Sequence, residues 1–171
     1  MNKILILLTC TLLIFGACKS KEGASKSSNA GERTKNKVLV GLDIQRIEVL
    51  RFPPYAKDGS RWDSFALLSA NPDIYVSIKQ LGKSLWKSNV KEDCEAGVKL
   101  DFTDLLPLEI RAFTNEVLIE VFDEDGVTND DNMGYITFRP SDFKKQNEIR
   151  LKTSDGELEL LLKVEWKYET R

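Results

Sequence analysis

Residues 158–166 read LELLLKVEW, and every second residue of this stretch is large and apolar. A period of two is typical of a β-strand that buries one face and exposes the other to solvent. The side chains that would share the buried face are Leu158, Leu160, Leu162, Val164 and Trp166. This stretch therefore predicts a strand that packs against a core.

The same period recurs along the chain from residue 37 onward. Residues 38–44 alternate in the same way, and the phase then slips before Ile47 and Val49, which predicts a bulge within one long first strand. No segment shows sustained helical periodicity. Further strands are predicted at 74–79, 84–87, 98–102, 117–122 and 135–138, with a hairpin turn at 81–83 and a short helical turn at 140–145. We therefore predict an all-β fold over residues 37–171, an antiparallel β-sandwich of about eight strands.

The first 36 residues follow a different pattern. A short positive start precedes the apolar run Ile4–Phe15, which is too short to cross a bilayer but fits a secretory signal. The run ends in Phe15-Gly16-Ala17-Cys18, which resembles the lipobox of bacterial lipoproteins. We expect residues 1–17 to be a lipoprotein signal peptide and Cys18 to carry the lipid. The alternative is an ordinary signal peptide in which Cys18 is incidental.

Residues 19–36 contain no large apolar side chain, so they cannot bury enough surface to offset the entropy of ordering. We predict that residues 18–36 are a lipidated cysteine and a disordered tether with a reach of about 25 Å. Lys19 is not the aspartate associated with retention at the inner membrane. The expected location is the bacterial cell envelope, lipid-anchored at the outer membrane.

Composition narrows the kinds of site that the domain can carry. The chain has 25 basic and 27 acidic side chains, a formal net charge of -2, and no histidine. The missing basic surplus argues against nucleic-acid binding, and the missing histidine excludes histidine-ligated zinc and Ser-His-Asp triads. Cys94, the one cysteine expected to remain as a thiol, has no histidine to activate it.

The loop that follows residues 117–122 gathers acidic side chains. Asp123, Asp125 and Asp131 lie in it, with Thr128 between them. Such charges repel one another, and a calcium ion, which takes six to eight oxygen ligands, would relieve the repulsion. A solvated acidic loop is the alternative. An EF-hand is excluded because Val127, Thr128 and Gly134 occupy positions where that motif needs other residues.

Two motifs together resemble a known family. The run Asp123-x-Asp125-x-x-Thr128-x-x-Asp131-x-x-Gly134 resembles the third calcium-binding loop of the C2 domain. Upstream, Asp73-Ile74-Tyr75-Val76 resembles the Asp-Pro-Tyr-Val that closes the first calcium loop of that family, with Ile74 in place of the proline. Leu67 stands where the family usually has a second carboxylate, and Asp63 is the nearest substitute.

The resemblance implies a calcium-dependent binding module, not an enzyme. The ligands that it implies are Asp63, Asp73, Asp123, Asp125 and Asp131 around Ca²⁺, and the number of ions stays open. Asp130 is left out because the side chain next to Asp131 on an extended chain points the other way. In such domains apolar loop tips enter the membrane interface, a role for which Phe65 and Val127 are the candidates here.

Three functional classes remain open. The first is calcium-dependent binding of phospholipid or another anionic membrane surface by an anchored lipoprotein. The second is a calcium-stabilised adaptor that binds a protein or glycan partner without contact between the loops and lipid. The third, a hydrolase with paired carboxylates, has no support beyond the acidic loops.

Overall fold

The computed structural model describes residues 36–62, 71–125 and 129–171. The predicted signal peptide, Cys18 and nearly all of the predicted tether lie outside the described residues. So do Asp63, Phe65, Val127 and Thr128.

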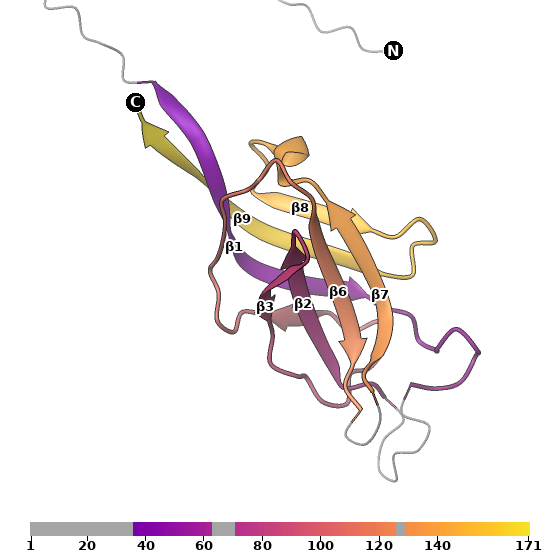
Figure 1. Ribbon diagram of the computed structural model, residues 1–171. Helices are drawn as coiled ribbons and strands as arrows, with labels where there is room; N and C mark the ends of the chain where they lie inside the picture. The colour runs from indigo at the N-terminus through magenta and orange to yellow at the C-terminus, as the bar shows by residue number, and fades with distance from the viewer. Residues whose placement is uncertain (1–35, 63–70, 126–128) are drawn as a thin grey trace, which may run out of the picture. The chain divides into compact units, whose positions relative to one another are not determined.

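The described residues form two antiparallel β-sheets that pack face to face (Figure 1). One sheet has the order β4-β1-β9-β8, with β5 also paired to β1, and the other has the order β3-β2-β6-β7. The nine strands of the described chain are β1 (Lys37–Arg51), β2 (Ile74–Gln80), β3 (Lys83–Lys87), β4 (Leu100–Phe102), β5 (Leu108–Ile110), β6 (Val117–Asp123), β7 (Asp131–Phe138), β8 (Glu148–Lys152) and β9 (Glu159–Thr170). A single turn of 3-10 helix, η1, spans Pro140–Phe143. The all-β sandwich prediction is confirmed.

The long first strand has the predicted bulge. The register between β1 and β9 shifts between Ile44 and Arg46, and further shifts lie near each end of the strand. On the two sides of this shift Leu42, Ile44, Ile47 and Val49 are all fully buried. The bulge thus returns the apolar residues to the core face after the change of phase.

The core lies between the sheets and takes one face of each strand. In β9 the predicted face Leu160, Leu162, Val164 and Trp166 is buried, together with Leu158 just before the strand. In the other sheet, Val76 and Ile78 of β2 lie opposite Val121 and Ile119 of β6. These four residues are fully buried, as are Ile74 and Val117. The outer sheet faces carry the charges.

Two strands were not predicted. β5 has only three residues and pairs with β1 through Leu42 and Ile110, so its sequence is too short for a period to stand out. β8 reads EIRLK and does alternate, with Ile149 and Leu151 buried, but it has only two apolar residues.

The hairpin turn was predicted correctly: Leu81 and Gly82 both have positive φ, as a tight two-residue hairpin requires.

Candidate functional site

Sheet register brings the ends of three strands together at one end of the four-stranded sheet. Asp123, the last residue of β6, pairs with Ile74 of β2 on one side and with Asp131 of β7 on the other. Asp73 directly precedes β2. The predicted residues Asp73, Asp123 and Asp131, which are far apart in sequence, therefore lie at neighbouring strand ends.

Asp73 and Asp123 are joined by hydrogen bonds. The backbone N–H of Asp73 donates to Oδ1 of Asp123 at 2.8 Å, and the N–H of Glu124 donates to the carbonyl oxygen of Asp73 at 2.8 Å. Asp123 is fully buried. Burial of a carboxylate is costly unless hydrogen bonds or a cation offset the lost hydration. The backbone N–H of Asp73 supplies part of that compensation and fixes the position of the carboxylate.

A third chain segment, at Asp93 and Cys94, also forms hydrogen bonds to Asp73 and its neighbour Pro72. The backbone N–H of Asp93 donates to Oδ1 of Asp73 at 2.8 Å, and the N–H of Cys94 donates to the carbonyl oxygen of Pro72 at 2.8 Å. This contact could not be predicted from the sequence. No motif marks it, because the donors are backbone groups about twenty residues further along the chain.

Cys94 belongs to this segment, and its side chain is a buried free thiol. Its Sγ–H donates to the carbonyl oxygen of Lys91 at 3.0 Å. Burial raises the pKa of the thiol above its ordinary value, so little thiolate forms near neutral pH. This environment favours an inert, structural role for the thiol.

Asp130 has a separate role on the outer face of the sheet. The hydroxyl of Tyr75 donates to Oδ2 of Asp130 at 2.6 Å, while the Tyr75 ring stacks on Phe122 at 5.0 Å between centroids and lies 3.6 Å from Nζ of Lys87. Burial, followed by the bond to Asp130, raises the pKa of the Tyr75 hydroxyl well above its ordinary value. Tyr75 and Asp130 thus tie the start of β2 to the segment just before β7.

The remaining predicted ligands are less constrained. Asp125 is half-buried at the end of a described segment, and Asp131 is exposed. Asp63 lies outside the described residues. In the part of the chain that the structure describes, no three acidic or thiol side chains lie close enough together to hold a metal ion.

The donor atoms nevertheless suit calcium, which prefers carboxylate and carbonyl oxygens. Asp73 and Asp123 each accept one backbone N–H at Oδ1, and because a carboxylate has further lone pairs, these hydrogen bonds do not by themselves exclude a cation.

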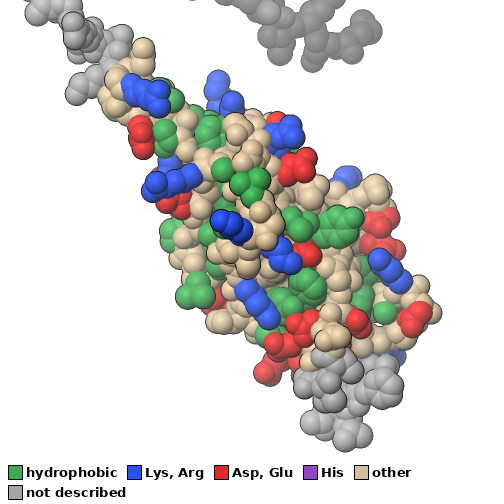
Figure 2. Space-filling view, viewed as in Figure 1, with side chains coloured by type: hydrophobic (Ala, Val, Ile, Leu, Met, Phe, Trp, Pro, Cys, Tyr) green, Lys and Arg blue, Asp and Glu red, His purple; other side chains and the backbone are tan. Residues whose placement is uncertain are grey.

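Acidic side chains gather at this end of the sandwich (Figure 2). Within the described residues, Asp73, Asp130 and Asp131 form no ion pair with lysine or arginine. We call the five residues Asp73, Asp123, Asp125, Asp130 and Asp131 the acidic end. The partners of Asp73 and Asp130 in these ranges are N–H and O–H donors, not cations.

No protein-family model matches the sequence, and no curated protein sequence matches it either. Within the described ranges no helix is long and apolar enough to span a membrane.

The chain is similar to several solved structures. They include a C2 domain of a plant extended synaptotagmin 1, with 18% identity, a TM-score of 0.43, and coverage of 78% of this chain and 98% of that one. A structure of two C2 domains of extended synaptotagmin 2 matches with 17% identity and a TM-score of 0.46 over 96% of this chain and 49% of that one. Human GIVD cytosolic phospholipase A2 matches with 20% identity and a TM-score of 0.45 over 75% of this chain. The match spans only 17% of the phospholipase.

Proposed function

We propose that this chain is a membrane-anchored lipoprotein whose β-sandwich binds calcium at the acidic end and, through calcium, phospholipid or another anionic membrane surface. The proposed ligands are Asp73, Asp123, Asp125 and Asp131, with Asp63 from the preceding loop. The proposed anchor is a lipid on Cys18, with residues 19–36 as the tether. We propose a binding role, not catalysis.

One observation carries the calcium proposal. Asp123 is fully buried and accepts the backbone N–H of Asp73, and both residues stand at strand ends beside Asp131. Three carboxylates at adjacent strand ends carry like charges that repel one another. A divalent cation would offset that repulsion, and its remaining coordination positions would be open to anionic head groups.

Weak affinity would be sufficient for this role. Extracellular calcium modules bind with dissociation constants of about 10⁻⁴ to 10⁻³ M, and we expect the same range here. A lipid on Cys18 would hold the domain near the membrane, where the tether gives an effective concentration on the order of millimolar. Phe65 and Val127 would enter the interface beside the ion.

The second candidate is a calcium-stabilised adaptor that binds a protein or glycan partner without contact between the loops and lipid. The proposed anchor on Cys18 favours it, because acyl chains already supply membrane attachment. Both candidates need calcium, and they differ in whether the loops touch lipid.

Vesicle co-sedimentation separates the two candidates. The probe is a chain that begins at Lys19 and so lacks the lipid, mixed with phosphatidylserine-containing vesicles or with pure phosphatidylcholine vesicles. Calcium-dependent pelleting with the anionic vesicles alone supports the first candidate. Calcium-dependent thermal stabilisation without pelleting supports the adaptor, and indifference to calcium in both assays contradicts both.

Two variants make the assay specific to the acidic end. Asp125→Asn removes a proposed ligand and should abolish calcium-dependent pelleting. Asp155→Asn removes an exposed carboxylate in the turn between β8 and β9 and should leave pelleting unchanged. Equal loss with both variants would indicate a general charge effect and contradict the site.

A further inference from the structure

Strand β7 is an unusual edge strand for this sandwich. It is the last strand of its sheet, so none of the described strands pairs with its outer edge. The edge strands β3 and β8 contain charged residues, which disfavour pairing with a strand of another chain: β3 reads KSLWK and β8 reads EIRLK. In β7, by contrast, the stretch from Tyr135 to Phe138 contains no charged residue.

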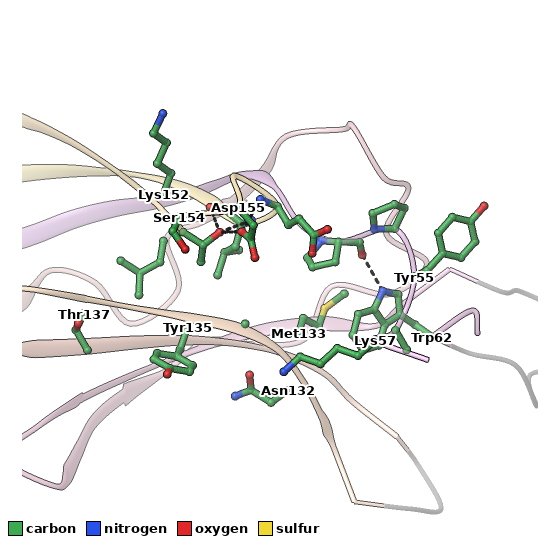
Figure 3. Close-up of a pocket in the computed structure, with 18 residues that line it drawn as sticks. Tyr55, Lys57, Trp62, Asn132, Met133, Tyr135, Thr137, Lys152, Ser154 and Asp155 are labelled. Carbon is green, nitrogen blue, oxygen red and sulfur yellow. Dashed lines mark hydrogen bonds between the residues drawn. The ribbon is translucent and has the colours of Figure 1, made fainter. Parts of the chain in front are cut away.

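A groove follows this edge between the two sheets. A hollow of about 770 Å³ lies between β7 and the turn that joins β8 to β9, with Met133 and Leu158 in its lining (Figure 3). A second hollow of about 480 Å³ adjoins it, and both are lined by Ile136, Thr137 and Lys152. Residues 53–57 and Trp62 form a further wall of the larger hollow. Among the described strands, none occupies the outer edge of β7.

The exposed surface of β7 is uncharged in the middle, where Tyr135 and Thr137 are exposed, and charged at its two ends. The Tyr135 side chain is 62% exposed. Asp130 and Asp131 stand at one end of the strand, and Arg139 follows its other end. Arg139 lies 3.6 Å from Glu116, but both side chains of this pair are about half exposed or more, so the pair is weak and exchangeable.

We propose that β7 pairs antiparallel with β7 of a second copy of this chain. A two-fold axis at Tyr135 places this residue opposite the same residue of the second copy. It also places Asp130 and Asp131, at the start of β7 in each copy, near Arg139 of the other copy. The bulge between Asn132 and Gly134 adds one residue to β7, so both Asp130 and Asp131 lie near that position.

The charge pattern selects this arrangement over parallel pairing. In a parallel pair, Asp131 of one copy would lie near Asp131 of the other copy. Like charges on neighbouring strands destabilise such a pair. In the antiparallel pair, each end combines opposite charges. A two-fold interface uses the same patch on both subunits, and β7 is self-complementary in that sense.

Cysteine cross-linking of the full chain in membranes tests the pairing. Tyr135→Cys places two thiols at the axis, at the short separation between facing residues of antiparallel strands, where a disulfide can form. Under mild copper-phenanthroline oxidation we expect a strong homodimer band. The parent chain, in which Cys94 is the one cysteine expected to remain as a thiol, reports the background. The matched control is Leu85→Cys on the opposite edge strand β3, where we expect no increase over the parent.

Two results would overturn the proposal. One is a dimer yield for Tyr135→Cys no higher than for the parent and Leu85→Cys. The other is cross-linking of Tyr135→Cys to a different protein, which would give the groove another occupant.

Charge reversal tests the register and direction. Arg139→Glu in the Tyr135→Cys chain should reduce the dimer band, and adding Asp130→Lys and Asp131→Lys should restore it. These reactions are run with chelator, so loss of a calcium site cannot change the result. An undiminished band with Arg139→Glu, or no restoration by the added reversals, contradicts antiparallel pairing about Tyr135. Thermal melts of each variant check that the fold is intact.

Discussion

Two parts of this domain are rich in carboxylates, and they differ in the groups that contact these carboxylates. On the outer face of the five-stranded sheet, Asp43, Glu48, Asp101 and Glu109 lie among Arg46, Lys99 and Lys167, a set that we call the paired face. At the acidic end, the partners that Asp73 and Asp130 find among the described residues are N–H and O–H groups.

The geometry of the paired face shows how the sheet supplies its own counterions. Nζ of Lys167 lies 3.0 Å from Oδ1 of Asp43 and 3.2 Å from Oε1 of Glu109. Nζ of Lys99 lies 3.3 Å from Oε2 of Glu48, which is almost fully buried. Each of these four carboxylates has a lysine or arginine partner. Among the described residues, Asp73, Asp130 and Asp131 of the acidic end have none. The comparison is the reason that we assign calcium to one region and a structural role to the other.

The largest expected difference is the response to calcium. Calcium at 100 times its dissociation constant should stabilise the fold by about 2.7 kcal/mol. Asp123→Asn should remove most of this gain, because it removes a buried carboxylate at the proposed site. Asp43→Asn on the paired face should keep it. Thermal melts with chelator and with millimolar calcium measure both, and a wild-type melting temperature that ignores calcium would leave only a sandwich with an acidic end.

The second prediction concerns the paired face itself. Glu48→Gln should lower the free energy of unfolding by about 1.5 kcal/mol, because it removes the ion pairs of Glu48 with Arg46 and Lys99, whose side chains are 40% and 53% exposed. The loss should be equal with calcium and with chelator. Denaturant unfolding under both conditions measures it, and a calcium-dependent loss would mean that the two regions are coupled.

The third prediction separates Asp130 from the proposed ligands. Tyr75→Phe should cost about 1 kcal/mol, the usual net value of one hydrogen bond, and should leave the calcium response intact.

The pH dependence of this variant follows from the raised pKa of Tyr75. A group whose pKa is higher in the folded state contributes stability below its unfolded pKa, which is about 10 for tyrosine, and this contribution is lost as pH rises above that value. Wild type should therefore lose stability above about pH 10 more steeply than Tyr75→Phe. Urea unfolding at a series of pH values measures this. If the free energy of unfolding falls equally with pH in wild type and Tyr75→Phe, the interpretation is contradicted.

The smallest effect is expected from Lys167→Met. Hydrogen bonds to Asp43 and Glu109 raise the pKa of Lys167, and its side chain is 38% exposed. The variant should be only slightly less stable than wild type at low salt, and the difference should shrink at 1 M salt because exposed charges are screened. A loss that persists at high salt would point to packing of the lysine stem instead.

Much of the fold could be predicted from the sequence because its signal is local. The alternation of apolar residues located β1, β2, β6 and β9, and the change of phase after Ile44 located a bulge. β5 escaped prediction because three residues cannot display a period, and β8 because a strand with two buried residues resembles a charged loop.

The acidic end illustrates the limit of that signal. Asp123, Asp125 and Asp131 are close in sequence, so their concentration of charge could be recognised directly. Asp73 could be added only through a resemblance between motifs. The N–H of Asp93 and the pairing of Tyr75 with Asp130 could not be found at all, since they depend on chain segments 20 and 55 residues apart.

The sequence by itself determined which residues face the core, because the period of a strand is set by the backbone geometry of each residue and its neighbours. Only the tertiary structure decided which strand ends meet, through the register of β2 with β6 and of β6 with β7. It also decided which carboxylates receive a lysine and which a backbone N–H, as for Glu48 and Asp73. Register depends on cross-strand packing over the whole sheet, and a shift of one residue would turn each of these side chains to the other face.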